Sequence, residues 1–246
     1  MISFSREDIF LITGASSGIG KDIALRFHEL GASVIASGRN MERLSSLKEK
    51  ASQPEKIFLE TKDLVENINE LPQWIRSLKE KYGRLKGLIS CAGIISDQPV
   101  QVLDENTAKR LFDINYFAPV FLAKGFSDRR VYAAENASIT FIASISAFLG
   151  EKAQTFYGAS KAALIASAKT MSHELAPKVR VNCVSPGPIG TEMTNQAIQT
   201  HGHANIERCT LGLGSVKDVS SLVAFLASQE ARWITGQNYI LDGGYI

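Results

Sequence analysis

The sequence predicts an α/β protein in which a seven-stranded parallel sheet is doubly wound, with helices on both faces. Short apolar runs alternate with segments whose apolar residues recur at helical spacing, and this alternation continues along the 246 residues. Runs that are apolar throughout are typical of parallel strands buried on both faces. Right-handed crossovers between such strands place helices on both sides of the sheet.

Each strand is predicted from a short apolar run bounded by turn residues. In chain order these runs are Ile9 to Ile12, Val34 to Ala36, Ile57 to Leu59, Leu88 to Cys91, Ile139 to Ala143, Val179 to Val184 and a last one near Tyr239 to Leu241. In the first helix Ile19, Ile23, Phe27 and Leu30 share one face, and Gly31 ends the helix. The other predicted helices are Met41 to Ala51, a segment around Leu71 to Tyr82, a long helix from about Asp104, one from about Thr155 and one from about Asp218.

Residues 1–246 are expected to form a single domain, because no linker rich in proline or serine interrupts the alternation. The stretch from Pro188 to Gly214 lacks clear periodicity and exceeds ordinary connection lengths, so we predict a substrate loop or lid there. His201 and His203 lie in this stretch. No third ligand follows them at a useful spacing, so no metal site is expected.

Composition argues against several classes of function. Hydrophobic residues make up 45% and charged residues 21%, as in ordinary globular proteins. The formal charge of +2 favours neither nucleic acid nor an anionic membrane as a partner, so a small molecule is expected. Three cysteines without metal or disulfide spacing, a charged first segment and the lack of an 18-residue apolar run predict a cytoplasmic protein.

Three glycines follow the first strand in the segment TGASSGIG, residues 13–20. Gly14 permits a tight exit from the strand, Gly18 lets the backbone approach a pyrophosphate, and Gly20 allows the helix to pack closely on the sheet. The helix that follows directs its dipole and free N–H groups at an anion. A plain turn with a helix cap would use the same residues, but the position straight after the first strand favours a dinucleotide.

The end of the second strand favours NADP(H) over NAD(H). NAD-selective sites carry Asp or Glu about 20 residues beyond the glycines, whereas this chain has Ser-Gly-Arg-Asn at residues 37–40. The guanidinium of Arg39 can grip a 2′-phosphate; the alternative is that Arg39 only begins a solvated helix. At the end of the third strand, Asp63 is expected either to accept the adenine amino group or to cap a helix.

Tyr157 and Lys161 are four residues apart and therefore share one face of a helix. A phenol with a pKa of about 10 is a poor acid at neutral pH, and a neighbouring ammonium lowers that pKa because it favours the phenolate. A Tyr/Lys pair at this spacing is also common on protein surfaces. The pair therefore gains its meaning from the motifs around it.

Those motifs occur in one order along the chain. They are TGASSGIG at 13–20, Asn115, Ser144 thirteen residues before Tyr157, YGASK at 157–161, Pro186-Gly187, Ile-Thr-Gly at 234–236 and Asp-Gly-Gly at 242–244. Together they resemble the short-chain dehydrogenase/reductase family over essentially the whole chain. The resemblance implies a single-domain Rossmann fold and an oxidoreductase that uses a nicotinamide cofactor.

The resemblance also implies a role for each catalytic residue. Tyr157 would protonate the carbonyl oxygen during reduction or act as the base in the reverse reaction. Lys161 would lower the pKa of that phenol and hydrogen-bond the nicotinamide ribose, and Ser144 would polarise the carbonyl. Asn115 would carry a water that links Lys161 to solvent. Pro119 agrees with this role, because it has no N–H for the Asn115 carbonyl; the alternative is a helix break.

The resemblance further implies a set of cofactor-binding residues, with the Ile189 backbone and the Thr191 hydroxyl on the nicotinamide carboxamide and the phosphates. The predicted set is Gly14, Ser16, Ser17, Gly18, Ile19, Gly20, Arg39, Asp63, Leu64, Ala92, Gly93, Tyr157, Lys161, Pro186, Gly187, Ile189 and Thr191.

The chain departs from the family pattern in two places. The usual Asn-Asn-Ala-Gly is Ser-Cys-Ala-Gly at residues 90–93, which keeps small residues beside the cofactor but lacks the amides; Cys91 is expected to be a core thiol. The stretch 211–219 resembles 3-oxoacyl-acyl-carrier-protein reductases. Ala-Ala-Glu-Asn at 133–136 replaces the basic residues expected at a carrier-docking surface, and Lys178 remains, so a carrier-protein partner is allowed but not favoured.

The sequence thus predicts an NADPH-dependent reductase that converts a ketone or aldehyde, with a 3-oxoacyl thioester as one candidate, into an alcohol. Two alternatives stay open: an NADP-linked alcohol or sugar dehydrogenase working in the oxidative direction, and a non-catalytic dinucleotide-binding regulator. A homodimer or homotetramer is expected, because the small residues Ala159, Ala163 and Ala166 would let the helix of Tyr157 approach another closely. The same residues could instead pack on the sheet.

Overall fold

A computed structural model describes residues 2–133, 135–192, 194 and 206–246 of the chain. Within these residues seven strands pair in parallel in the order β3-β2-β1-β4-β5-β6-β7. The strands are β1 (Ile9–Thr13), β2 (Ser33–Gly38), β3 (Ile57–Thr61), β4 (Leu85–Ser90), β5 (Ala137–Ile142), β6 (Val179–Pro186) and β7 (Asn238–Leu241). The predicted seven-stranded parallel sheet is confirmed, and its strand order reverses between β1 and β4, where such sheets bind ligands.

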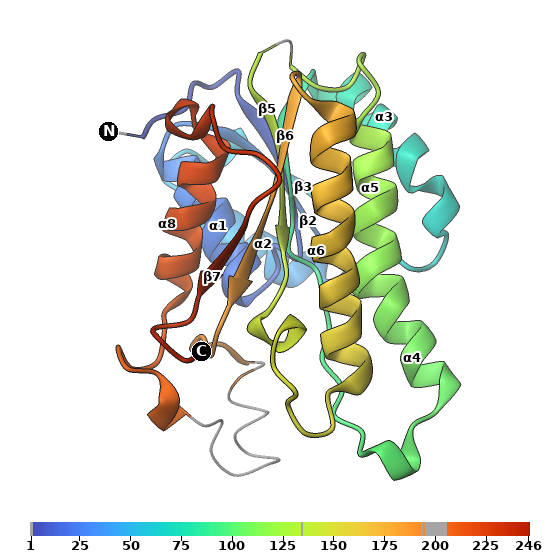
Figure 1. Ribbon diagram of the computed structural model, residues 1–246. Coiled ribbons are helices and arrows are strands. Elements are labelled where there is room, and N and C mark those ends of the chain that lie inside the picture. The colour runs from blue at the N-terminus through green and yellow to red at the C-terminus, as the bar shows by residue number, and fades with distance from the viewer. Residues whose placement is uncertain (1, 134, 193, 195–205) are drawn as a thin grey trace.

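Helices cover both faces of the sheet, as predicted (Figure 1). Their bounds are α1 (Gly18–Glu29), α2 (Met41–Glu49), α3 (Leu71–Tyr82), α4 (Glu105–Phe112), α5 (Ala118–Phe126), α6 (Thr155–Leu175) and α8 (Val216–Ala227). The face with α1, α2 and α8 encloses one apolar cluster, and the face with α3, α5 and α6 encloses the other. In the described part of the chain, no helix has the length and apolar character needed to span a membrane.

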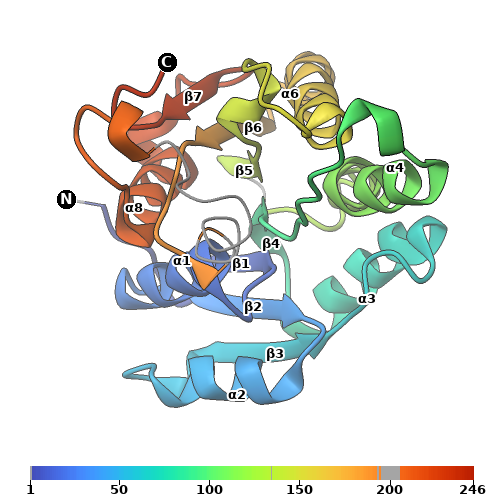
Figure 2. The same cartoon turned by 90° about the horizontal axis from the view of Figure 1, so that it is seen from below.

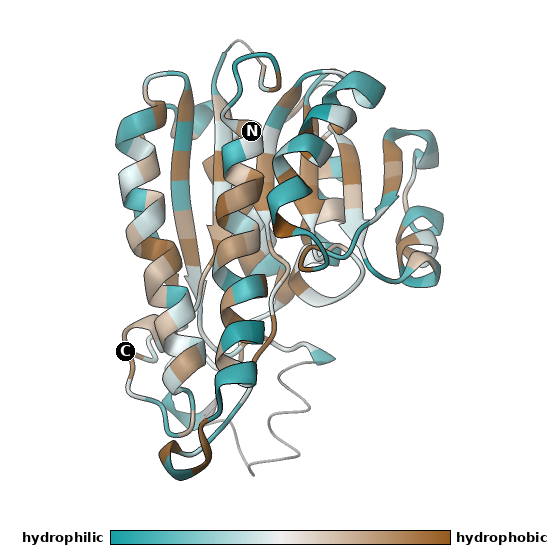
Figure 3. Ribbon diagram, turned by 90° about the vertical axis from the view of Figure 1, so that its right-hand side faces the viewer, coloured by the Kyte–Doolittle hydropathy of each residue, from teal (hydrophilic) through white to brown (hydrophobic). Residues whose placement is uncertain are grey.

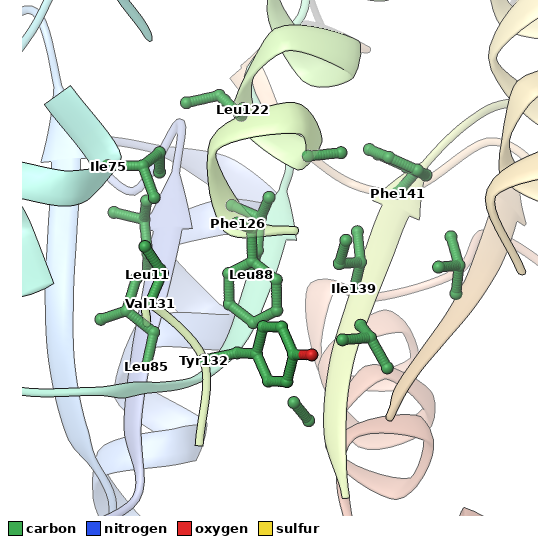
Figure 4. Packing of buried hydrophobic residues seen from close by; sticks show 14 of the residues in the cluster. Leu11, Ile75, Leu85, Leu88, Leu122, Phe126, Val131, Tyr132, Ile139 and Phe141 are labelled. Carbon is green, nitrogen blue, oxygen red and sulfur yellow. The ribbon is translucent and has the colours of Figure 1, made fainter. Parts of the chain in front are cut away.

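The core on the α5 side shows why the strands are apolar throughout. Leu11, Leu88 and Ile139 come from the neighbouring strands β1, β4 and β5 and are fully buried beneath Phe126 of α5 (Figure 4). Burial of each such side chain contributes about 1.5–3 kcal/mol before entropy is counted. Figure 3 shows the same division between core and surface: the strands are mostly hydrophobic (brown), and the helices in front of them carry recurring hydrophilic residues (teal).

The helix that carries Asn115 does not break at Pro119. Between α4 and α5 the chain forms a π-helical turn, Asp113–Phe117, in which the Ala118 N–H reaches back to the Asp113 carbonyl. Pro119 has no N–H, so it cannot be the α-helical donor to the Asn115 carbonyl, and the wider turn accommodates this loss. The turn places Asn115, which is 0% exposed, inside the protein.

The predicted loop from Pro188 to Gly214 is described only at its two ends. Gly190 N–H donates to the Gly214 carbonyl at 2.9 Å, and Gly214 N–H donates to the Pro188 carbonyl at 3.1 Å. These bonds bring the two ends together beside the carboxyl end of β6. Residues 193 and 195–205, with His201 and His203, lie outside the described residues, so the lid itself stays a prediction.

Candidate active site

One cavity of about 680 Å³ lies at the carboxyl edge of the sheet, the edge that faces the viewer in Figure 2. The structure brings nearly all the predicted site residues around it. Those on its wall are Gly14, Ser16, Ser17, Gly18, Ile19, Gly20, Arg39, Asp63, Leu64, Ala92, Gly93, Ser144, Tyr157, Lys161, Pro186, Gly187, Ile189 and Thr191. Asn115 lies behind the wall.

The turn after β1 has the shape that a pyrophosphate cradle needs. Gly14 has φ +69°, and a Cβ there would lie 2.8 Å from the Ala92 nitrogen; a Cβ on Gly20 would collide with the Gly14 carbonyl oxygen. Any larger residue would therefore push the turn away from the sheet. In the described residues no side chain caps the start of α1, and its first turn carries no acidic residue. Its N–H groups can therefore bind the phosphates of a dinucleotide.

The adenosine end of the cavity lies beside β2 and β3. Arg39 is exposed on the cavity wall, one position before Asn40, whose side chain caps α2 by accepting from the Arg43 N–H at 2.8 Å. Helix α2 therefore begins at Met41, and contact of Arg39 with a 2′-phosphate stays a prediction. Asp63 accepts from the Val65 N–H at 3.1 Å in a local turn, so the alternative in which it caps a helix is wrong. Contact of Asp63 with adenine stays a prediction.

Ser144 and Tyr157 meet at the centre of the cavity. Ser144 follows β5 and accepts from the Ser146 N–H at 3.1 Å, which fixes its hydroxyl at the strand end. Tyr157 lies in the first turn of α6, and its phenol is close enough to the Ser144 side chain for that hydroxyl to lower its pKa. Two hydroxyl groups thus converge where a carbonyl oxygen could sit between them.

The electrostatics of Tyr157 differ from the expectation. Burial raises the pKa of its phenol, the Ser144 hydrogen bond lowers it, and the charge of Asp97 raises it; Lys161 does not contribute. The reason is geometric, because Lys161 Nζ lies 5.9 Å from the centre of the Tyr157 ring and donates to the Ile142 carbonyl at 2.9 Å. In this structure the phenol is therefore held in its neutral, proton-donating form.

Asn115 holds the segment after β4 against α6. Its Oδ1 accepts from the Ile94 N–H at 2.9 Å, while Nδ2 donates to the Ile94 carbonyl at 2.9 Å and to Ser160 Oγ at 3.2 Å. A Cβ on Gly93 would lie 3.0 Å from Asn115 Oδ1 and 3.3 Å from Lys161 Nζ. The side chain thus positions the wall next to Lys161, whereas the sequence pointed only to its main-chain carbonyl.

The Ser-Cys pair that departs from the family pattern is held by β1. Thr13 Oγ1 accepts from the N–H groups of Cys91 at 3.2 Å and Ala92 at 3.3 Å. Burial raises the pKa of the Cys91 thiol to about 12, so the thiol stays neutral. The neutral thiol agrees with the expectation of a core cysteine. Cys91 is only half-buried, however, and it lines the cavity.

Sequence reasoning missed one end of the cavity. Glu151, Gln154 and Tyr245 lie on its wall together with the apolar residues Ile145 and Leu149. Gln154 could have been predicted, because it lies three residues before Tyr157 at the start of the same helix. Tyr245 is brought in by the fold and had no local signal.

The fold and this cavity define a nucleotide-binding α/β oxidoreductase. The family model described as enoyl-(acyl carrier protein) reductase matches residues 14–246, and the chain belongs to the short-chain dehydrogenase/reductase family. Members of this family use nicotinamide dinucleotide cofactors, and one similar solved structure is described as ElxO with NADP bound (27% identity, TM-score 0.87, covering 97% of this chain and 98% of that chain).

Curated relatives and solved structures resemble the chain over its full length. The 3-oxoacyl-[acyl-carrier-protein] reductase FabG of Thermotoga maritima is 34% identical over 241 residues, 97% of each chain. FabG of Rickettsia prowazekii is 36% identical over 238 residues, 96% of this chain and 95% of the relative. A short-chain dehydrogenase/reductase from Brucella melitensis, described as glucose/ribitol dehydrogenase, has a TM-score of 0.92 at 30% identity and covers 100% of this chain and 99% of that chain.

Proposed function

We propose that the protein is an NADPH-dependent reductase that converts a ketone carbonyl into an alcohol, with Tyr157 as the proton donor. The observation that carries the proposal is the placement of the Ser144 and Tyr157 side chains on one cavity wall beside the buried Lys161. We further propose that residues 1–246 act as one domain, in the cytoplasm and as a homodimer or homotetramer.

The residues present fit a dinucleotide. The glycine turn and the uncapped start of α1 would hold the pyrophosphate, Arg39 the 2′-phosphate, and Thr191 a phosphate or the carboxamide. Lys161 is 5% exposed, and no carboxylate in the described residues forms an ion pair with it. Ribose hydroxyls would give this ammonium the acceptors that it lacks.

The nicotinamide, when bound, supplies the hydride. The chain's own residues manage the proton and the charge on oxygen. Ser144 Oγ donates a hydrogen bond to the substrate oxygen, and Tyr157 Oη donates its proton to the same oxygen as negative charge develops there. The phenolate left on Tyr157 is then stabilised by the Ser144 hydroxyl, which lowers the pKa of the phenol, while Lys161 holds the nicotinamide ribose.

A 3-oxoacyl thioester is the substrate that the relatives support best. Several curated relatives that match over at least 95% of their own length are 3-oxoacyl-[acyl-carrier-protein] reductases. Ile94, Ile95 and Leu149 give the cavity an apolar wall that suits an acyl chain. Ala-Ala-Glu-Asn at residues 133–136 replaces the basic residues expected at a carrier-docking surface, so a free thioester is the proposed test substrate.

The test is NADPH and NADH oxidation, followed at 340 nm, with 3-oxobutanoyl-N-acetylcysteamine, a diketone, a steroid ketone and a keto sugar. The proposal expects turnover of the thioester with NADPH at a kcat/KM well above that of the other ketones. Turnover of a sugar alcohol with NADP⁺ and none of the thioester would replace it with the oxidative alternative, which the resemblance to a glucose/ribitol dehydrogenase keeps open. NADPH binding without any turnover would instead support the regulator.

A further inference from the structure

The cavity runs across the sheet, and its two ends lie over different strands. Arg39 and Asp63 follow β2 and β3 at one side, whereas Tyr245 follows β7 at the opposite edge. Tyr157 and Lys161 lie between them on α6. A dinucleotide that extends from Arg39 to Lys161 therefore leaves the part beyond Lys161, toward β7, for the group attached to the substrate carbonyl.

Tyr245 closes that far end. Its side chain is only 8% exposed and packs with Ile145, Leu149 and Cys209 in a small apolar cluster. Asp242 fixes the backbone on either side of it, because its carboxylate accepts from the N–H groups of Gly244 and Ile246 at 3.0 Å each. The ring therefore has a defined position on the cavity wall.

Two charged side chains hold the phenol end of that ring. Tyr245 Oη donates to Glu151 Oε1 at 3.1 Å, and Arg208 Nη1 lies 3.9 Å from the same oxygen. The Arg208 guanidinium also lies over the Tyr245 ring, 4.5 Å from its centre. Glu151 itself lines the cavity, so it places a carboxylate on the wall at the end next to Tyr245.

We propose that Tyr245 and Glu151 form a specificity-determining wall: Tyr245 limits the length of the group that the carbonyl substrate carries toward β7, and Glu151 excludes an anionic group there. The proposal deepens the reductase function given above and rests on it. Removal of the ring opens the end of the cavity to longer chains. Neutralisation of Glu151 leaves the positive charge of Arg208 to attract an anion.

The length limit is tested with 3-oxobutanoyl and 3-oxodecanoyl thioesters of N-acetylcysteamine. Tyr245→Ala is expected to raise kcat/KM for the long substrate relative to the short one by about tenfold, a typical effect of reshaping an apolar pocket. Tyr245→Phe keeps the ring and is expected to preserve the wild-type ratio. NADPH affinity and the melting temperature show whether each variant is folded, and an unchanged ratio in folded Tyr245→Ala overturns the length limit.

The charge effect is tested with the 3-oxoadipyl half-thioester of N-acetylcysteamine, which carries a free carboxylate. Glu151→Gln is expected to raise kcat/KM for this substrate by about tenfold relative to the 3-oxobutanoyl thioester. The control is Glu230→Gln, which removes the charge of an exposed residue that does not line the cavity and is expected to leave the ratio unchanged. An equal ratio in wild type and Glu151→Gln overturns the charge effect.

A binding measurement separates this inference from the reductase function. Affinities of the matching 3-hydroxyacyl thioesters for the NADP⁺-loaded protein are measured by calorimetry in the same variants. Lack of turnover by the wild type overturns the proposed function. The ratio of the affinities for the long and short thioesters is still expected to rise in Tyr245→Ala. Equal ratios for wild type and Tyr245→Ala, or no binding of either thioester, overturn the wall.

Discussion

The ammonium of Lys161 donates a hydrogen bond to the main-chain carbonyl of Ile142 at 2.9 Å, on the wall of the cavity that Tyr157 also lines. Burial lowers the pKa of Lys161 to about 8. Its positive charge is therefore lost just above neutral pH, in the range where a reductase is assayed. The proposed charged hydrogen bonds from Lys161 to the nicotinamide ribose depend on that charge.

The rate of ketone reduction is expected to fall as the pH rises through about 8, because deprotonated Lys161 is no longer the charged donor that holds the nicotinamide ribose. The measurement is kcat/KM with NADPH between pH 6 and pH 10. Lys152→Met removes an exposed lysine near the cavity and should leave the profile unchanged. A flat profile to pH 10 in the wild type would show that Lys161 does not carry this role.

Arg39→Ala is expected to raise the Michaelis constant for NADPH by about tenfold to a hundredfold, as for the loss of charged hydrogen bonds to a phosphate. The constant for NADH should change little, since NADH has no 2′-phosphate for the guanidinium. Arg39→Lys keeps the charge without the planar guanidinium, so its Michaelis constant for NADPH should lie between those of the wild type and Arg39→Ala. Equal effects on the two cofactors would contradict a phosphate role for Arg39.

Asn115→Ala removes three hydrogen bonds from a fully buried position and leaves both main-chain groups of Ile94 without a side-chain partner. Unpaired buried groups cost about 1–3 kcal/mol each, so the free energy of unfolding is expected to fall by about 2–5 kcal/mol in urea titrations. The exposed Asn69 provides the control, because Asn69→Ala should change the stability by less than about 0.5 kcal/mol. A similarly small change in stability for both variants would refute the stabilising role of the Asn115 hydrogen bonds.

His28 makes stability depend on pH at the far end of α1. Its Nε2 accepts from the Gln53 N–H at 3.1 Å, and burial, followed by the charge of Lys56, lowers its pKa from the usual 6.5. The unfolded state therefore binds the proton more tightly, so this stability is complete above pH 6.5 and is lost as the pH falls toward the folded pKa. The urea concentration at the unfolding midpoint should decrease when the pH is lowered from 7.5 to 5.5. The decrease should be smaller in His28→Gln than in the wild type. Identical losses in both proteins would rule out His28 as the cause.

The strands could be predicted from the sequence because each is buried on both faces and so reads as a continuous apolar run. Their ends were harder to place: β4 begins at Leu85, three residues before the predicted start, since Lys86 and Gly87 interrupt the apolar pattern. The glycine turn and the Tyr157/Lys161 pair were visible as local motifs. Their placement around one cavity follows from the fold.

The rest of the site depends on contacts between distant segments. Tyr245 meets Glu151 across 94 residues, and Asn115 meets Ser160 across 45, so neither contact leaves a local pattern. The distance from Lys161 to the Tyr157 ring was equally hidden, because spacing on a helix fixes the shared face but not where a long side chain ends. Such features become visible only when the chain is folded.

The most direct test of the central claim compares the wild type with Tyr157→Phe, which removes one oxygen atom and keeps the ring. NADPH oxidation with 3-oxobutanoyl-N-acetylcysteamine is followed at 340 nm, and NADPH affinity is measured by calorimetry in both proteins. We expect turnover by the wild type, loss of turnover by Tyr157→Phe and nearly equal affinities for NADPH. Retained turnover by Tyr157→Phe would contradict the assignment of the phenol as the proton donor.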